Sequence, residues 1–333
     1  MPLIAPPSDR ELLELVGNRH EAVIVSRRPY RYATSAALEE LQMRTGDCET
    51  ALILKDLSRE RLLGDARVTK PVFLHEPERE IETYRRILAP AGLGPELIAS
   101  CSRTDPPRHW LLLEKVPGVE LWQVGELSVW EAVASWLGRF HAGFASRLDE
   151  VSRANPHLLH YSGDWFRGWC VRARAALAAS SDVRAPLLDE ALERYDAVIA
   201  AVLAVPPTFV HGELYPSNVL VVPAERPVRV CPVDWEMAGI GPGLLDLAAL
   251  VGGWSDAERD RLATAYLENL GDADAAVSPS QALSLDLARC RLHLALQWLG
   301  WSTDWQPPAQ HARDWLGEAL ELVRHLGLAE GSP

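Results

Sequence analysis

Cysteine is scarce and scattered in this sequence. The five cysteines, Cys48, Cys101, Cys170, Cys231 and Cys290, are odd in number and include no Cys-x-x-Cys pair. This spacing indicates neither a zinc site nor a disulfide framework. The N-terminus lacks a basic region followed by an apolar stretch of signal length. No run approaches the roughly 18 apolar residues that a membrane span needs. We therefore expect a cytoplasmic protein with reduced cysteines and no membrane partner.

A positive net charge is also absent. The 33 lysines and arginines face 46 aspartates and glutamates, which gives a formal net charge of −13 at pH 7. A nucleic-acid binder needs a basic footprint, so the charge argues against this class of protein. An acidic surface suits a cationic substrate, but it also serves solubility alone, and the sequence leaves both open. The 333 residues, without repeats or low-complexity segments, suffice for two domains or one large bilobal unit.

Two stretches in the second half of the chain combine apolar, strand-like runs with acids and amides. The first, over 209–222, reads Phe-Val, His-Gly-Glu, four further residues, Asn, and Val-Leu-Val-Val. The second, over 230–236, reads Val-Cys-Pro-Val and ends in Asp-Trp-Glu. A β-hairpin would bring their polar side chains into one acidic pocket, namely Glu213, Asn218, Asp234 and Glu236. Carboxylate and amide oxygens suit a divalent cation, so the pattern predicts a metal site.

The first third of the chain is predicted to be rich in strands. Strands joined by turns are expected over 28–57, and one of them is an apolar run closed by Lys55. A helix is predicted to begin near Pro77, to place Ile81, Tyr84 and Leu88 on one face, and to end at Pro90. Another apolar strand, 110–113, then runs through Glu114 and Val116 into a Pro-Gly breaker.

The remainder is predicted to be mainly helical. Helices are expected over 129–205 and from 244 to 327, with a loop over 239–243. The first of them carries Trp130, Val133, Leu137, Phe140 and Phe144 on one face, and His141 beside them is interpreted as a buried structural histidine. A strand-rich third followed by a helix-rich remainder is an α+β pattern.

These motifs resemble those of the aminoglycoside phosphotransferase and choline kinase-like family, relatives of protein kinases that phosphorylate small molecules. The family's catalytic loop reads His-Gly-Asp-x-x-x-x-Asn and its metal strand reads Asp-Trp-Glu or a close variant. Here the spacing is intact, but Glu213 stands at the aspartate position. The resemblance covers Lys55 through Asp246 at least. It implies a bilobal protein-kinase-like fold with a small β-rich nucleotide-binding N-lobe (1–115), a hinge (116–118) and a large helical C-lobe (119–333).

The resemblance also implies an activity and a set of roles. The protein would use ATP and Mg²⁺ to phosphorylate a hydroxyl of a small molecule, such as an aminoglycoside, another sugar-containing metabolite or an amino alcohol. Glu213 would accept or orient the acceptor proton. Lys55, oriented by Glu80, would bind the phosphates, and Asn218 and Asp234 would bind Mg²⁺. Glu236 would bind a second Mg²⁺ or support the loop, and Asp246 would brace the catalytic loop. The adenine would bond the backbone between Glu114 and Val116, and Ser35 would belong to a glycine-free phosphate loop over 34–37.

Several alternatives remain open. Lys55 also fits an edge residue that reaches water, and the helix from Pro77 fits a plain solvated face. The extra methylene of Glu213 displaces its carboxylate by roughly 1.5 Å, and a misplacement near 1 Å can cost on the order of 10²-fold in rate. A weak or inactive nucleotide-binding pseudokinase with a regulatory role is therefore the alternative function. A protein kinase is the least favoured function, because neither an Asp-Phe-Gly nor an Ala-Pro-Glu motif of an activation segment follows Asp234.

Aromatic and acidic groups in the second half of the chain allow two interpretations each. Most of the twelve tryptophans lie in the expected C-lobe (119–333), and they fit either a hydrophobic core or a surface that stacks on substrate. Trp305, in a loop-like stretch, is the best candidate for a substrate-facing residue. Asp256, Glu258 and Asp260 form an acidic group that could attract a polycation or be plain surface.

Overall fold

The computed structural model describes residues 5–17, 22–31, 35–64, 66–105, 107–271, 281–301 and 313–328. The chain forms two compact units. The first contains 1–118 together with the short segments 154–157 and 231–236, and the second contains 119–153, 158–230 and 237–333. The predicted boundaries of N-lobe, hinge and C-lobe describe functional parts of the chain and stay predictions.

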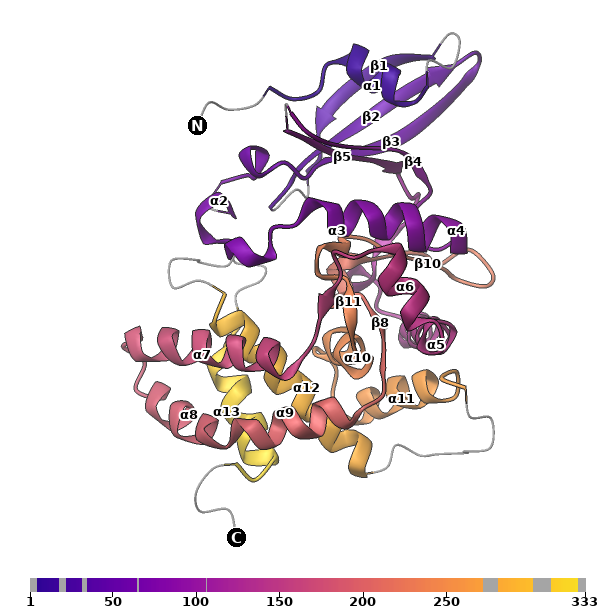
Figure 1. Cartoon of the computed structure of the whole chain (residues 1–333). Coiled ribbons are helices and arrows are strands. Elements are labelled where there is room, and N and C mark those ends of the chain that lie inside the picture. The colour runs from indigo at the N-terminus through magenta and orange to yellow at the C-terminus, as the bar shows by residue number, and fades with distance from the viewer. Residues whose placement is uncertain are drawn as a thin grey trace. The chain divides into compact units, whose positions relative to one another are not determined.

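The first unit is built on a five-stranded antiparallel sheet of order β1-β2-β3-β5-β4 (Figure 1). Alternate side chains of its central strands are buried together with Leu12 of the short helix α1, which Ser8 and Glu11 cap at its N-terminus. The elements are α1 (Asp9–Leu15), β1 (Ala22–Pro29), β2 (Ala37–Thr45), β3 (Cys48–Asp56), β4 (Leu97–Thr104) and β5 (Pro107–Glu114).

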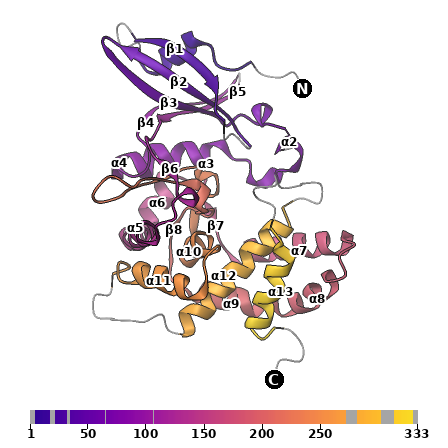
Figure 2. The same ribbon diagram turned by 180° about the vertical axis from the view of Figure 1, so that it is seen from behind.

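A helix with an irregular middle packs against β4 and β5 in the same unit (Figures 1 and 2). It follows α2 (Ala66–Thr69) and consists of α3 (Pro77–Glu82), the π-helical segment Thr83–Leu88 and α4 (Ala89–Ala91). The predicted start and the buried face are confirmed. The predicted end at Pro90 is wrong by one residue. Pro90 stands in the first turn after the π-helical segment, where its missing N–H is tolerated.

The second unit is mainly helical, as predicted, and its long helix α12 packs against α7, α10 and α13. Helices α12 and α13 lie side by side in both views (Figures 1 and 2). No helix in the described ranges is long and apolar enough to cross a membrane. The helices are α5 (Leu127–Ala145), α6 (Leu148–Ala154), α7 (Gly163–Ala179), α8 (Ala185–Ala191), α9 (Tyr195–Ala204), α10 (Leu244–Val251), α11 (Asp256–Leu267), α12 (Gln281–Leu299) and α13 (Trp315–His325).

Two small sheets complete the fold. One has the order β10-β9-β6 and the other β7-β11-β8. The strands are β6 (Val119–Glu120), β7 (Leu159–His160), β8 (Pro207–Val210), β9 (Val219–Val222), β10 (Arg229–Pro232) and β11 (Gly239–Pro242). The mixture of a strand-rich first unit and a helix-rich second unit confirms the α+β class. All five cysteines lie in the described ranges, and none of them is joined in a disulfide.

The predicted loop over 239–243 is wrong, because its first four residues form β11, which pairs with β8 and β7. The glycines there serve close packing instead of a turn. A Cβ on Gly241 would lie 2.6 Å from the Cβ of Tyr161, so only glycine lets this ring cross the strand. The prediction of helices over 129–205 also missed strand β7. This strand has only two residues, and its partner β11 lies far along the chain.

Candidate functional site

A buried lysine lies among carboxylates in the first unit. Leu54 of β3 belongs to the core with α1, so the next residue, Lys55, points to the opposite face of the sheet. Its Nζ donates to both carboxylate oxygens of Glu80 in α3, at 2.8 and 2.7 Å, and to Oδ1 of Asp234 at 2.5 Å. Lys55 is 7% exposed and Glu80 is 0% exposed. The structure thus forms the Lys55–Glu80 ion pair that the family resemblance implies.

The charges of this cluster favour an ammonium ion at Lys55. Burial alone lowers the pKa of Lys55, but the carboxylates of Asp234, Glu80 and Glu236 outweigh it, and the net shift is upward. For Glu80, burial raises the pKa, and the ammonium group of Lys55 acts in the opposite direction. Among the described residues, Lys55 and Lys70 face three carboxylates, so the cluster retains an excess of negative charge. Such an excess suits an additional cation.

Asp234 is held in an unusual backbone conformation. Its φ is +67°, and it is the one residue other than glycine with positive φ in the part of the chain that the structure describes. The next residue, Trp235, is buried, and its backbone N–H donates to Oε1 of Glu80 at 3.2 Å. The turn after β10 is therefore fixed against Glu80, and this fixes the direction of the Asp234 carboxylate. Strain of this kind is concentrated at functional sites.

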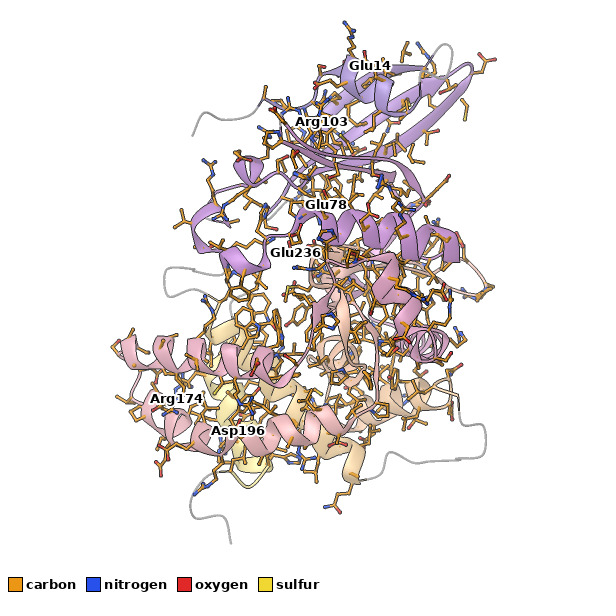
Figure 3. All side chains as sticks on the ribbon, in the orientation of Figure 1. Glu14, Glu78, Arg103, Arg174, Asp196 and Glu236 are labelled. Carbon is orange, nitrogen blue, oxygen red and sulfur yellow. The ribbon has the colours of Figure 1, made fainter. Side chains whose placement is uncertain are left out.

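Glu236 has a partner that sequence reasoning missed. Its carboxylate pairs with the buried ammonium of Lys70, which directly follows α2. Its backbone carbonyl accepts a bond of 2.6 Å from Arg79, which also donates to the carbonyl of His157 at 2.9 Å. Glu236 consequently lies near the beginning of α3, close to Glu78 (Figure 3). The sequence offered only a single lysine, Lys70, before a proline, and this pattern does not by itself predict an ion pair with Glu236.

In the second unit, Asp246 at the beginning of α10 holds the His-Gly-Glu loop. Its carboxylate accepts the backbone N–H groups of His211 at 2.7 Å and of Gly212 at 2.8 Å. His141 is buried, as expected, with Nε2 3.2 Å from the same carboxylate and Nδ1 2.9 Å from the hydroxyl of Tyr266. The structure therefore gives Asp246 the bracing position that the motif implied.

The glycine of this loop is required by its surroundings. Gly212 has a φ of +85°, which L-residues with a side chain rarely adopt. A Cβ there would lie 2.0 Å from the hydroxyl oxygen of Tyr161 and 2.4 Å from the carbonyl of Met237. These two groups are themselves joined by a hydrogen bond of 2.7 Å. The chain therefore passes so close to Tyr161 that no other residue fits.

Glu213 is half-buried, and its backbone and side chain are both held. Its N–H donates to Nδ1 of His211 at 3.3 Å, and its carbonyl accepts from Nδ2 of Asn218 at 3.0 Å. One carboxylate oxygen, Oε1, accepts from Nε2 of Gln297 in α12 at 3.2 Å. Sequence reasoning missed Gln297. The available signal was a single amide within an apolar stretch of that helix.

The donors of the predicted metal site fit Mg²⁺ chemically. Asn218 uses its Nδ2 on the Glu213 carbonyl, which leaves Oδ1 as the atom able to bind a cation. Asp234 offers a carboxylate that is about one-third exposed. Within the described ranges, no three His, Cys, Asp or Glu side chains form a metal-binding group. Mg²⁺ does not need such a group, because it commonly takes one or two protein ligands together with phosphates and water.

The structure brings the predicted site residues together in two sets. Lys55, Glu80, Asp234 and Glu236 share one cluster in the first unit, and Glu213 and Asn218 share the loop in the second. Ser35 precedes β2, and its carbonyl accepts the N–H of Leu63. Glu114 ends β5, with its carboxylate on the N–H of Glu96, and Val116 is buried. Thr34 and Trp305 lie outside the described residues.

Solved structures of several phosphotransferases resemble this chain. Choline kinase LicA from Streptococcus pneumoniae has a TM-score of 0.60 at 14% identity, over 96% of this chain and 98% of that chain. Macrolide 2'-phosphotransferase MphH from Brachybacterium faecium has a TM-score of 0.58 at 17% identity, over 98% and 99%. The GDP complex of aminoglycoside 2'-phosphotransferase-IIIa has a TM-score of 0.58 at 14% identity, over 96% and 98%. At these identities the likeness shows a shared kinase-like fold.

Sequence comparison identifies the family. No curated protein sequence matches the chain. The sequence pattern of the Phosphotransferase enzyme family, however, matches residues 44–279, which is well over half of the chain and includes both sets of site residues. This chain belongs to the phosphotransferase enzyme family.

Proposed function

We propose that this chain is an ATP-dependent phosphotransferase that moves the γ-phosphate to a hydroxyl of a small molecule. The observation that carries the proposal is the buried ion pair of Lys55 and Glu80 with its contact to Asp234. Removing the charged groups of Lys55 and Glu80 from water costs more than such contacts usually return, so a cluster of this kind is poorly explained by stability alone. A lysine fixed by a glutamate beside a metal-binding aspartate is what phosphoryl transfer requires.

The residues of the first unit would hold the donor nucleotide. Lys55 would bind phosphate oxygens while Glu80, which engages it through both carboxylate oxygens, keeps it in place. Asp234 and Asn218 are the residues that would hold Mg²⁺, which neutralises the charge of the phosphates when bound. Glu236 would stabilise the turn through its ion pair with Lys70. Backbone groups between Glu114 and Val116 would bind the adenine, and Ser35 would lie in the phosphate loop.

Glu213 would act on the acceptor. It would orient the acceptor hydroxyl and take up its proton as the hydroxyl oxygen bonds to the γ-phosphorus and the bond from that phosphorus to the ADP oxygen breaks. The contacts of its backbone with His211 and Asn218, and the support of the loop by Asp246, would hold this carboxylate in position. Transfer then depends mainly on positioning and on charge, since little covalent chemistry is asked of the protein.

The names of the relatives and the charge of the chain support the proposed acceptor class. The similar structures are named as kinases or phosphotransferases of choline, aminoglycosides and a macrolide, and one of them is a GDP complex. By analogy, the acceptor would be an aminoglycoside, another sugar-containing metabolite or an amino alcohol. The net charge of −13 is compatible with a cationic acceptor.

The replacement of aspartate by Glu213 favours one second candidate, a nucleotide-binding protein with weak or no catalysis. The test is ADP release with ATP, Mg²⁺ and a panel of acceptors, for the wild type and for Glu213→Gln. We expect the variant to lose on the order of 10²-fold or more in kcat while its nucleotide affinity, measured by calorimetry, stays the same. Nucleotide binding without turnover in the wild type supports the second candidate, and equal turnover removes Glu213 from the mechanism.

A further inference from the structure

Gln297 is a buried amide inside an apolar part of α12. It is 2% exposed, and the five residues that precede it, 292–296, are buried as well. An amide in such surroundings is costly unless it is hydrogen-bonded. The partner that the structure provides is Oε1 of Glu213, at 3.2 Å from Nε2. The buried amide is therefore directed at the one side chain that departs from the family's motif.

Helix α12 is well placed to hold the loop. It packs against α7, α10 and α13, so its backbone is fixed from several sides. The residue after Gln297 makes a parallel contact, because Nε1 of Trp298 donates to the hydroxyl of Tyr215 at 2.7 Å. Two neighbouring residues of one packed helix thus bind Glu213 and Tyr215, which are two positions apart in the loop.

A glutamate at this position needs such a restraint. It reaches about 1.5 Å further than aspartate, and its additional torsion must be fixed before the carboxylate can be aimed. The bond that Gln297 donates to Oε1 fixes the side chain at its end, where the carboxylate would receive the proton. A neutral amide can hold the carboxylate and leave its negative charge in place, whereas a lysine or arginine would cancel that charge.

We propose that Gln297 is a positioning residue that holds Oε1 of Glu213 and so aligns the carboxylate with the acceptor hydroxyl. This inference rests on the proposed phosphotransferase function and deepens it. It explains how glutamate serves where the family's motif has aspartate: the extra length of the side chain is taken up by a contact from α12.

The test compares full-length Gln297→Met with the wild type, using the acceptor that the wild type phosphorylates. Methionine has a similar length and no donor, so the fold should tolerate it. We expect kcat to fall about 10- to 100-fold, with the KM values for ATP and acceptor changing by less than about threefold. Gln281→Leu, at the exposed start of α12, is the matched control and should keep wild-type kcat. Gln297→Glu, which replaces the donor with a second carboxylate, should lose more than Gln297→Met.

A double-mutant cycle separates positioning from a general disturbance of the helix. The shorter side chain of Glu213→Asp does not reach Gln297, so Gln297→Met should change kcat by less than about twofold in that background. His293→Leu, one turn earlier in α12, disturbs the same core without touching the loop and reports the effect of lost packing alone. Thermal unfolding of each variant shows whether it is folded at the assay temperature.

Any of four results would overturn the inference. Wild-type kcat in both Gln297→Met and Gln297→Glu shows that the contact has no role in turnover. Equal losses in the wild-type and Glu213→Asp backgrounds, or an equal loss in His293→Leu, show that α12 acts through packing only. A wild type that phosphorylates nothing removes the proposed function and this inference together, whereas an active wild type with fully active variants removes this inference alone.

Discussion

At the scale of single residues, Lys55 joins the elements of the first unit. Its ammonium group bonds Glu80 from α3 and Asp234 from the turn after β10, at 2.5 to 2.8 Å. Neither partner is close to it in sequence. The ion pair of Lys55 with Glu80 could be expected because the family that the motifs resemble pairs a strand lysine with a glutamate of the following helix. The role of this pair in binding a nucleotide stays a prediction.

Removing Lys55 should destabilise the protein through the charge that remains. In Lys55→Met, Glu80 stays fully buried without its cation, and breaking a buried pair in this way costs about 3–5 kcal/mol. Adding Glu80→Gln should restore part of the loss, because a neutral amide is cheaper to bury than a carboxylate. Urea unfolding at pH 7 measures the free energy of unfolding of both variants.

The matched control is Glu82→Gln in the same helix, which breaks ion pairs with the partly exposed Arg85 and Arg86. It should cost no more than about 1 kcal/mol. A similar loss in Lys55→Met and Glu82→Gln would contradict the special position of the buried pair, and so would a double variant less stable than Lys55→Met.

At the scale of elements, the His-Gly-Glu loop depends on contacts that its own sequence does not reveal. Asp246 could be assigned as its brace because the family's motif includes an acid at that place. The contact of Gln297 with Glu213 could not be predicted, because nothing in the sequence of α12 indicates which of its turns faces the loop. For the same reason β11 was not predicted. Its glycines indicate a turn in the sequence, whereas in the structure they allow Tyr161 to pack across the strand.

Gly212 should tolerate no side chain. In Gly212→Ala the Cβ would meet the hydroxyl of Tyr161 and the carbonyl of Met237, and the positive φ would be strained as well. We expect a loss of about 2–3 kcal/mol in the free energy of unfolding, together with most of kcat. Adding Tyr161→Phe should recover part of the stability, because it removes the nearest clashing atom. The measurement is thermal unfolding of the two variants and of Tyr161→Phe alone. Full stability of Gly212→Ala would refute this description of the loop.

At the scale of the whole molecule, the α+β class was predictable because strands and helices are separated along the chain. A strand-rich first third and a helix-rich remainder follow from apolar periodicity alone. The assignment of 231–236 to the first unit was not predictable, since it depends on packing between segments far apart in sequence. Lys70 and Arg79, which hold Glu236, belong to the same class of long-range contacts.

Stability should depend on pH through a buried histidine. Burial lowers the pKa of His293 to about 3, whereas an unfolded histidine titrates near its ordinary value of 6.5. Between these values the unfolded state binds a proton that the folded state does not, so stability falls as the pH falls from about 6.5 towards 3. The slope from this group is about 1.4 kcal/mol per pH unit. Urea unfolding at pH 7 and 5 should show a smaller difference in His293→Leu than in the wild type, and an unchanged difference would rule out this source.

The most direct test of the central proposal is detection of the phosphorylated acceptor itself. The wild type is incubated with ATP, Mg²⁺ and the acceptor panel, and the products are examined by mass spectrometry, with Glu213→Gln and Lys55→Met alongside. We expect that one class of small hydroxyl compound gains a single phosphoryl group with the wild type, and that both variants yield at least about 10²-fold less product. A wild type that binds ATP but phosphorylates no acceptor, or variants that match its yield, would rule out the proposed function.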